Sequence, residues 1–191
     1  MFVRLYGCNV KCSYCDQPQK PCDRKRMSVE NIMIAIRKLR VPYVCITGGE
    51  PLIQPEVYVL IYELMAEDYK VSIETNGCVP LDESGYSHRS YKYIMDVKCP
   101  SSGVSDKNVY ENLGKLLSHD EVKFVIANEE DYSFATRVIK RYPTEAKILF
   151  SPMFDEEGNP VITQQLIDWM LRDRLHKARV QVQIHKILNV K

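Results

Sequence analysis

The chain has 191 residues, of which 45% are hydrophobic, which is enough for one well-buried domain and short for two. It carries 26 Lys and Arg against 25 Asp and Glu, so the net charge of +1 gives no general electrostatic reason to expect binding to nucleic acid or to a membrane. No window is apolar enough to span a membrane, and the first twenty residues lack the apolar core of a signal peptide. We therefore expect a single domain over residues 1–191, cytoplasmic, with reduced cysteine thiols.

Short β-rich segments alternate with helical patterns along the chain. Strands are predicted at residues 2–6, 43–47, 70–75, 91–97, 121–127, 146–151 and 179–185. Ser28 is a plausible N-cap for a first helix, and Val57 to Met65 carry the apolar spacing of a second. Further helices are predicted near 108–118, 130–141 and 163–176, whereas 78–90 reads as a long loop that replaces a crossover helix.

This alternation is typical of an α/β fold with a mostly parallel sheet and helices packed outside it. A closed eight-stranded barrel typically needs about 250 residues. Six or seven strands in 191 residues therefore predict an incomplete barrel of the TIM type. In such folds the loops after the strands open on one side, which would gather Thr47 to Glu50, Glu74 to Asn76, Asp96, Lys98, Ser151 and His185 at one mouth.

Three cysteines follow the first predicted strand in the segment "YGCNVKCSYCD". Their close spacing suits one metal centre, and thiolates are ligands for zinc and for iron–sulfur clusters. A structural zinc site needs a fourth ligand, which Cys22, Cys45, Cys78, Cys99 or a histidine would have to supply. Since those cysteines form no second close-spaced pair, we favour a four-iron cluster with one iron left open for a substrate or cofactor.

The segment "TGGEP" at 47–51 directly follows the second predicted strand. Two glycines let a ligand lie against bare backbone, and Glu50 offers a negative acceptor for an ammonium group. With the three-cysteine loop, it resembles the radical S-adenosylmethionine (SAM) superfamily. The resemblance implies that Cys8, Cys12 and Cys15 hold a [4Fe–4S] cluster, that Gly48, Gly49 and Glu50 receive the SAM amino group, and that Tyr14 lies near the adenine.

A narrower resemblance covers nearly the whole chain. The segments "FVRLYGCNVKCSYCD", "TGGEPLIQ", "ETNG", "DVKCPSSG", "SPM" and "QIHKILNVK" are similar to the 7-carboxy-7-deazaguanine synthase family, radical SAM lyases of 7-deazapurine (queuosine-type) biosynthesis. That resemblance implies ring contraction of 6-carboxy-5,6,7,8-tetrahydropterin with loss of ammonia, an electron donor such as flavodoxin or ferredoxin, and a homodimer. It implies substrate contacts from Arg4, Thr47, His185 and the carboxylate of Lys191. It implies SAM contacts from Tyr14, Cys15, Asp16, Gly48, Gly49, Glu50, Glu74, Asp96, Lys98 and Ser151.

The sequence departs from the family pattern in three places. The family usually has a Gln-Gly-Glu-Gly segment before the first strand, which this chain lacks, so either that segment belongs before Met1 or the pterin is held differently. Asp16 and Gln17 stand where the family has Asp-Thr, and the Gln17 carbonyl or Asp16 would then be the ligand for magnesium. Asp96 replaces a usual serine, and Lys98 would offset its charge.

Each of these residues also has an ordinary structural interpretation. Arg4 would face solvent on an edge strand, His185 would bond to backbone, and Glu74 and Lys98 would form an ion pair across neighbouring strands. Two other functions remain as alternatives: a radical SAM enzyme that installs a glycyl radical on a partner protein, and a non-enzymatic zinc-binding module.

Overall fold

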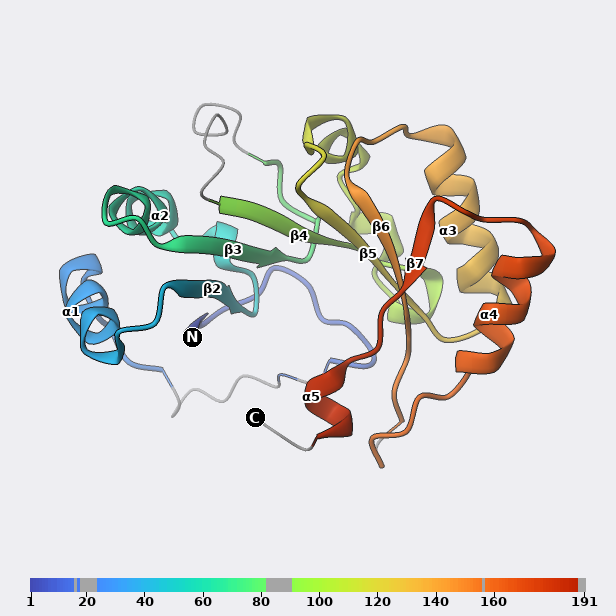
Figure 1. The fold of residues 1–191 in the computed structure, drawn as a ribbon, viewed down its shortest axis with the longest axis horizontal. Helices are drawn as coiled ribbons and strands as arrows, with labels where there is room; N and C mark the ends of the chain where they lie inside the picture. The colour runs from blue at the N-terminus through green and yellow to red at the C-terminus, as the bar shows by residue number, and fades with distance from the viewer. Residues whose placement is uncertain (16, 18–23, 82–90, 156, 189–191) are drawn as a thin grey trace.

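A computed structural model describes residues 1–15, 17, 24–81, 91–155 and 157–188. In these residues seven strands form one parallel sheet whose spatial order equals their order in the chain, and the first and last strands do not pair (Figure 1). The incomplete barrel predicted from the sequence is therefore confirmed. The strands are β1 (Phe2–Leu5), β2 (Tyr43–Gly48), β3 (Lys70–Thr75), β4 (Tyr91–Val97), β5 (Glu121–Ile126), β6 (Lys147–Pro152) and β7 (Ala178–Val180).

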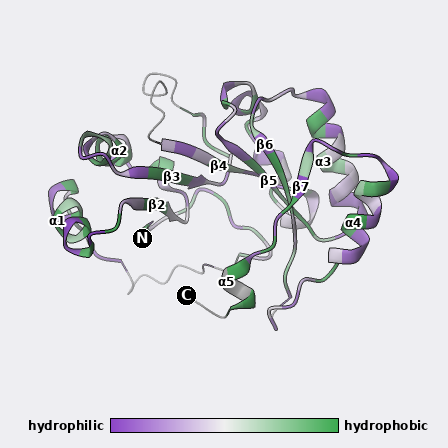
Figure 2. Ribbon diagram, viewed as in Figure 1, coloured by the Kyte–Doolittle hydropathy of each residue, from purple (hydrophilic) through white to green (hydrophobic). Residues whose placement is uncertain are grey.

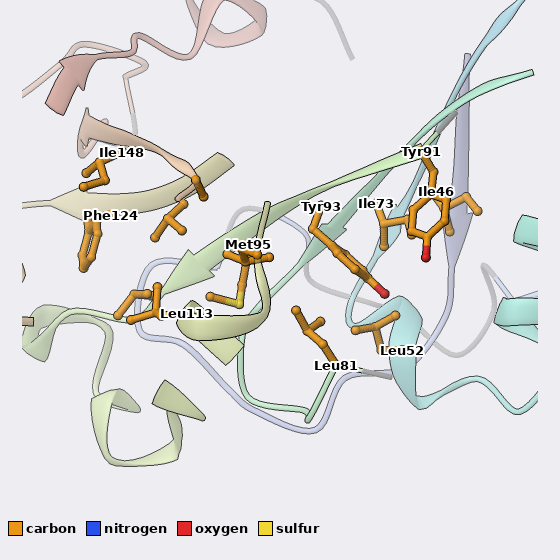
Figure 3. Packing of buried hydrophobic residues seen from close by; sticks show 14 of the residues in the cluster. Ile46, Leu52, Ile73, Leu81, Tyr91, Tyr93, Met95, Leu113, Phe124 and Ile148 are labelled. Carbon is orange, nitrogen blue, oxygen red and sulfur yellow. The ribbon is translucent and has the colours of Figure 1, made fainter. Parts of the chain in front are cut away.

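Burial alternates along the central strands, as the two-residue period of a strand requires. One face of the sheet packs into the hydrophobic core, and Figure 3 shows that this core is built from successive strands, with Ile46 of β2, Ile73 of β3, Tyr93 of β4 and Phe124 of β5. The alternate positions form the other face, and many of them are polar. That polar face carries Arg4, Thr47, Glu74, Asp96, Lys123 and Ser151.

Helices α1 (Val29–Leu39) and α2 (Val57–Ala66) lie at one end of the sheet, and α3 (Glu129–Arg141) and α4 (Thr163–Arg172) at the other (Figure 1). Figure 2 shows apolar and polar residues interspersed along these helices, as expected where only one helix face packs on a sheet. The predicted N-cap is confirmed, because the Ser28 Oγ accepts a hydrogen bond from the Asn31 backbone N–H at 3.3 Å. Asn128 caps α3 in the same way.

The helix predicted near 108–118 is confirmed only in part. The structure has a 3₁₀ helix there, η5 (Tyr110–Lys115), rather than an α-helix, and it follows another short 3₁₀ helix, η4 (Ser105–Lys107). The Asn112 amide accepts from the Leu81 N–H and donates to the Val79 carbonyl, both at 2.9 Å, so side-chain bonds to another segment hold these turns in place. Helix α4 also ends at Arg172, four residues earlier than predicted.

The predicted strand 179–185 was mostly wrong. Strand β7 stops at Val180, and His185 lies in a short helix, α5 (Ile184–Ile187), rather than at a strand end. The neighbouring strand β6 ends at Pro152, which has no N–H to continue the ladder, so the alternating residues beyond Gln181 have no strand to pair with. Two further short 3₁₀ helices follow strands, η2 (Pro51–Ile53) after β2 and η3 (Pro100–Ser102) after β4.

Of the loop predicted at 78–90, residues 82–90 lie outside the described part of the chain. Within that part, no helix combines the length and the apolar character that crossing a lipid bilayer would require.

Candidate functional site

The carboxyl ends of the first four strands bring the predicted motifs together. The loop after β1 is bonded to the "GGE" turn after β2, because Gly49 N donates to the Leu5 carbonyl at 3.2 Å and Glu50 N donates to the Gly7 carbonyl at 2.8 Å. The same loop is bonded to η3 after β4, where the Ser13 Oγ donates to the Ser101 carbonyl at 2.6 Å. Segments that lie far apart in the chain, by up to 88 residues, therefore share one edge of the sheet.

Cys8 and Cys15 are exposed on this loop and Cys12 is half-buried. Burial raises the pKa of the Cys12 thiol, and the positive charge of nearby Lys98 opposes this rise. The charges of Cys15 and Cys8 raise the Cys12 pKa further, so the three sulfurs are close enough to interact electrostatically. In the described residues no three His, Cys, Asp or Glu side chains are arranged to hold a metal ion. The donor set nevertheless fits an iron–sulfur cluster, since three free thiols on one loop are the ligands that such a cluster needs, and the charge of Lys98 favours the thiolate form of Cys12.

Gly48 is required by the sheet itself. Its φ is +140°, and a Cβ added there would lie 1.9 Å from the Leu5 carbonyl oxygen. Gly48 therefore packs closely against the backbone of β1, where a larger residue would not fit. This close packing requires glycine independently of the ligand contact predicted for Gly48.

Glu50 is completely buried and its carboxylate is bound by the protein. It accepts hydrogen bonds from Leu52 N at 3.0 Å, from the Thr75 hydroxyl at 2.9 Å and from Asn76 N at 2.6 Å. Burial raises the pKa of Glu50, and these three hydrogen bonds oppose the rise. The carboxylate predicted to receive the SAM amino group thus joins the turn after β2 to the end of β3.

Asp96 and Lys98 lie together, and the structure adds a third residue that the sequence analysis missed. Lys98 Nζ lies 2.6 Å from one Asp96 carboxylate oxygen, and Lys123 Nζ lies 3.0 Å from the other. Burial would raise the pKa of Asp96, but the two lysines lower it to about 2. Two lysines, Lys98 and Lys123, therefore offset the extra negative charge that Asp96 brings. Lys123 was detectable as a charge between the apolar residues Val122 and Phe124 of β5, and the structure places it opposite Asp96.

Thr47 and Glu74 are paired with each other, since the Thr47 hydroxyl donates to a Glu74 carboxylate oxygen at 3.0 Å. The expected alternative of a Glu74–Lys98 ion pair is not what forms, because Lys98 pairs with Asp96. Arg4 is exposed, lies beside Thr47 in the β1–β2 register, and places its guanidinium 5.5 Å from the centre of the Phe2 ring. Arg4, Thr47 and Glu74 thus form a row across the polar face of the sheet.

Two buried hydroxyls at this edge have no hydrogen-bond partner among the described residues. One belongs to Tyr14, whose pKa is raised by burial, and the other to Ser151 at the end of β6, which has no exposed surface. Since buried polar groups are normally satisfied, both hydroxyls are open to a polar ligand. Both residues were predicted to contact SAM.

The structure gives fewer contacts for the remaining predicted site residues. Gln17 is exposed, and Asp16 and Lys191 lie outside the described residues. Cys78, which the sequence analysis treated as an ordinary thiol, lies near Cys8 and Cys12, and burial raises its pKa to about 11. It is therefore protonated at neutral pH.

Sequence comparisons agree with these observations. The Radical SAM superfamily model matches residues 2–87. The 7-carboxy-7-deazaguanine synthase of Methanospirillum hungatei JF-1 is 40% identical over 100% of this chain and 77% of the relative. The synthase of Koribacter versatilis is 38% identical over 98% of this chain and 87% of the relative.

The fold also matches solved structures. QueE from Escherichia coli has a TM-score of 0.66 at 19% identity, over 95% of this chain and 84% of that protein. SuiB from Streptococcus suis, bound to S-adenosylmethionine, has a TM-score of 0.68 at 12% identity, over 92% of this chain and 48% of that protein. At such identities these matches show the fold alone. Because the sequence matches to these synthases cover nearly the whole chain, the chain belongs to the 7-carboxy-7-deazaguanine synthase family of radical SAM enzymes.

Proposed function

We propose that this chain converts 6-carboxy-5,6,7,8-tetrahydropterin to 7-carboxy-7-deazaguanine with loss of ammonia. Family membership gives the reaction class and the cofactors, SAM and a [4Fe–4S] cluster. The observation that carries the proposal for this chain is the hydrogen-bonded contact between the three-thiol loop and the "GGE" turn, through Glu50 N and the Gly7 carbonyl. Two motifs that would bind the same cofactor are held together by backbone hydrogen bonds.

When bound, the cluster and SAM would together supply the one-electron chemistry that removes a hydrogen atom from the substrate. Cys8, Cys12 and Cys15 would hold the cluster. Lys98, fixed by Asp96 and close to Cys12, would provide positive charge for the SAM carboxylate. Tyr14 and Ser151 would direct their unpaired hydroxyls at the same cofactor.

Arg4 and Thr47 would bind the pterin. An anionic heterocycle needs a guanidinium for its carboxylate and hydrogen-bonding groups for its ring, and the exposed Arg4 lies beside Thr47 on the polar face of the sheet. His185 and the Lys191 carboxylate would complete this set from the end of the chain.

The test is anaerobic reconstitution of the cluster followed by addition of SAM, a reductant and 6-carboxytetrahydropterin, with products followed by mass spectrometry. The proposal expects ammonia loss from the pterin together with 5′-deoxyadenosine. SAM cleavage without pterin turnover would refute the assignment of the substrate but keep the radical SAM class. Formation of a glycyl radical on an added partner protein would favour the activating-enzyme alternative. Failure to take up iron, with stoichiometric zinc, would support the zinc-binding module.

Magnesium is a separate proposal. The side-chain carbonyl of the exposed Gln17 offers a hard oxygen ligand where the family has a threonine. If this ligand operates, removing magnesium by chelation lowers turnover, magnesium restores it, and Gln17→Ala abolishes the response. Equal turnover with and without chelator would contradict it.

Three further features of the protein in its cell are also proposed. Its electron donor would be a flavodoxin or a ferredoxin, because the cluster must be reduced one electron at a time. The protein would act as a homodimer. It would be located in the cytoplasm, where its free thiols would stay reduced. Light scattering on the reconstituted protein checks the dimer, and reduction by purified flavodoxin or ferredoxin checks the donor.

A further inference from the structure

We infer that Asn76 is a positioning residue for the cluster, whose side-chain amide donates a hydrogen bond to the Cys8 sulfur. The Asn76 Nδ2 lies 3.7 Å from Cys8 Sγ and 2.8 Å from the Asn9 Oδ1. Asn76 is buried at the end of β3, whereas Cys8 is on the loop after β1, so one side chain joins two segments 68 residues apart. The inference rests on the proposed role of Cys8 as an iron ligand.

Backbone groups fix the orientation of this amide. The Asn76 Oδ1 accepts a hydrogen bond from Cys78 N at 2.8 Å, and a backbone N–H can only donate, so the oxygen must point there. The Nδ2 group therefore faces the cysteine loop. Asn9 is fixed in the same manner, because its Nδ2 donates to the Cys78 carbonyl at 3.1 Å, which leaves its oxygen to accept from Asn76.

The backbone of Asn76 is held just as firmly. Its N–H donates to the buried Glu50 carboxylate at 2.6 Å. The next residue, Gly77, has a φ of +72°, and a Cβ there would lie 2.1 Å from the Asp96 carbonyl oxygen, so the turn has little freedom to change. The turns after β2 and β3 thus form a rigid base, and the Asn76 amide extends from it to Cys8.

Hydrogen bonds to cluster sulfurs are among the factors that set the reduction potential of an iron–sulfur centre, along with net charge and solvent exposure. A donor to the Cys8 thiolate stabilises the added electron, so it raises the potential. Two of the three proposed ligands are exposed, which leaves few protein groups to orient them. Asn76 would supply both orientation and this electronic effect.

The experiment compares Asn76→Asp and Asn76→Ser with the unaltered protein, all reconstituted anaerobically. Asp is nearly isosteric but places an oxygen toward the Cys8 sulfur and the Asn9 oxygen, while Ser removes the amide without adding charge. Both variants are expected to shift the cluster midpoint potential to more negative values, measured by redox titration with electron paramagnetic resonance. The shift should be larger for Asp, and both variants should lose iron faster to a chelator.

Asn112→Asp is the matched control. Asn112 is also buried, and its side-chain oxygen also accepts from one backbone N–H, that of Leu81, but its Nδ2 donates to the Val79 backbone carbonyl rather than to a cysteine. It should lower thermal stability without moving the potential. Unchanged midpoint potentials in both Asn76 variants, or the same shift in Asn112→Asp, would overturn this inference and leave the proposed function standing. A wild-type protein that takes up no iron would overturn the proposed function, and this inference with it.

Discussion

Lys123 was not recognised from the sequence, and its removal gives a quantitative test of the charge arrangement at the site. Its ammonium lies 3.0 Å from Asp96, and the Asp96 and Lys123 side chains are only 18% and 23% exposed. The pKa of Asp96 falls from 3.8 to about 2. A depression of nearly two units corresponds to about 2.5 kcal/mol at neutral pH, at roughly 1.4 kcal/mol per unit. The charge of Lys123 is the largest single contribution that lowers this pKa.

Lys123→Met should therefore destabilise the fold by about 2 kcal/mol at pH 7, because a largely buried carboxylate loses one of its two partners. Urea unfolding followed by circular dichroism, at matched iron content, measures this. The pKa of Asp96 is depressed in the folded state, so its stabilisation is present above about pH 4 and is lost as the pH falls through about 2. The difference between Lys123→Met and the unaltered protein should accordingly shrink at acid pH.

Lys92→Met is a matched control on the same two strands. Lys92 Nζ lies 3.0 Å from Glu121, the same separation, but the lysine side chain is 36% exposed. Such a pair is worth about 0.2–1 kcal/mol, so this variant should cost less than Lys123→Met. If the two substitutions cost the same, or if the Lys123→Met difference does not depend on pH, the assignment of a buried charge network to Asp96 is wrong.

Three other substitutions have clear expected outcomes. Cys12→Ala should abolish the iron–sulfur absorption of the reconstituted protein, and retained absorption would contradict its ligand role. Cys78→Ala should retain iron, because that thiol lies outside the three-cysteine loop and donates to the Asn76 carbonyl at 3.5 Å; iron loss equal to that in Cys12→Ala would make Cys78 a ligand. Gly48→Ala should cost about 3 kcal/mol or more in thermal or urea unfolding, whereas Gly114→Ala, with open space around its Cβ, should be close to neutral; equal costs would refute the close approach of Leu5.

Much of the fold could be predicted because its signals are local. The β-rich segments "KVSIET" and "YKYIMDV" predicted strands β3 and β4 with their observed bounds, and the Ser28 cap predicted the start of α1. The 3₁₀ form of the region near 108–118 could not be predicted, because its apolar spacing suits an α-helix while Asn112 bonds to a distant segment. His185 was misplaced since the alternation around it is that of a strand, but β6 ends at a proline and offers it no partner.

For the site, the sequence by itself determined which chemistry is present: three closely spaced thiols without a fourth close partner, two glycines and a carboxylate after a strand, and an order of motifs that identifies the family. Only the tertiary structure decided how these groups are used. Glu50 is satisfied by Leu52, Thr75 and Asn76, Asp96 is neutralised by Lys98 and Lys123, and the Asn76 amide faces Cys8. The reason is physical: spacing along a chain fixes what one loop can bind, whereas a buried charge or amide depends on partners that the parallel register brings from other strands.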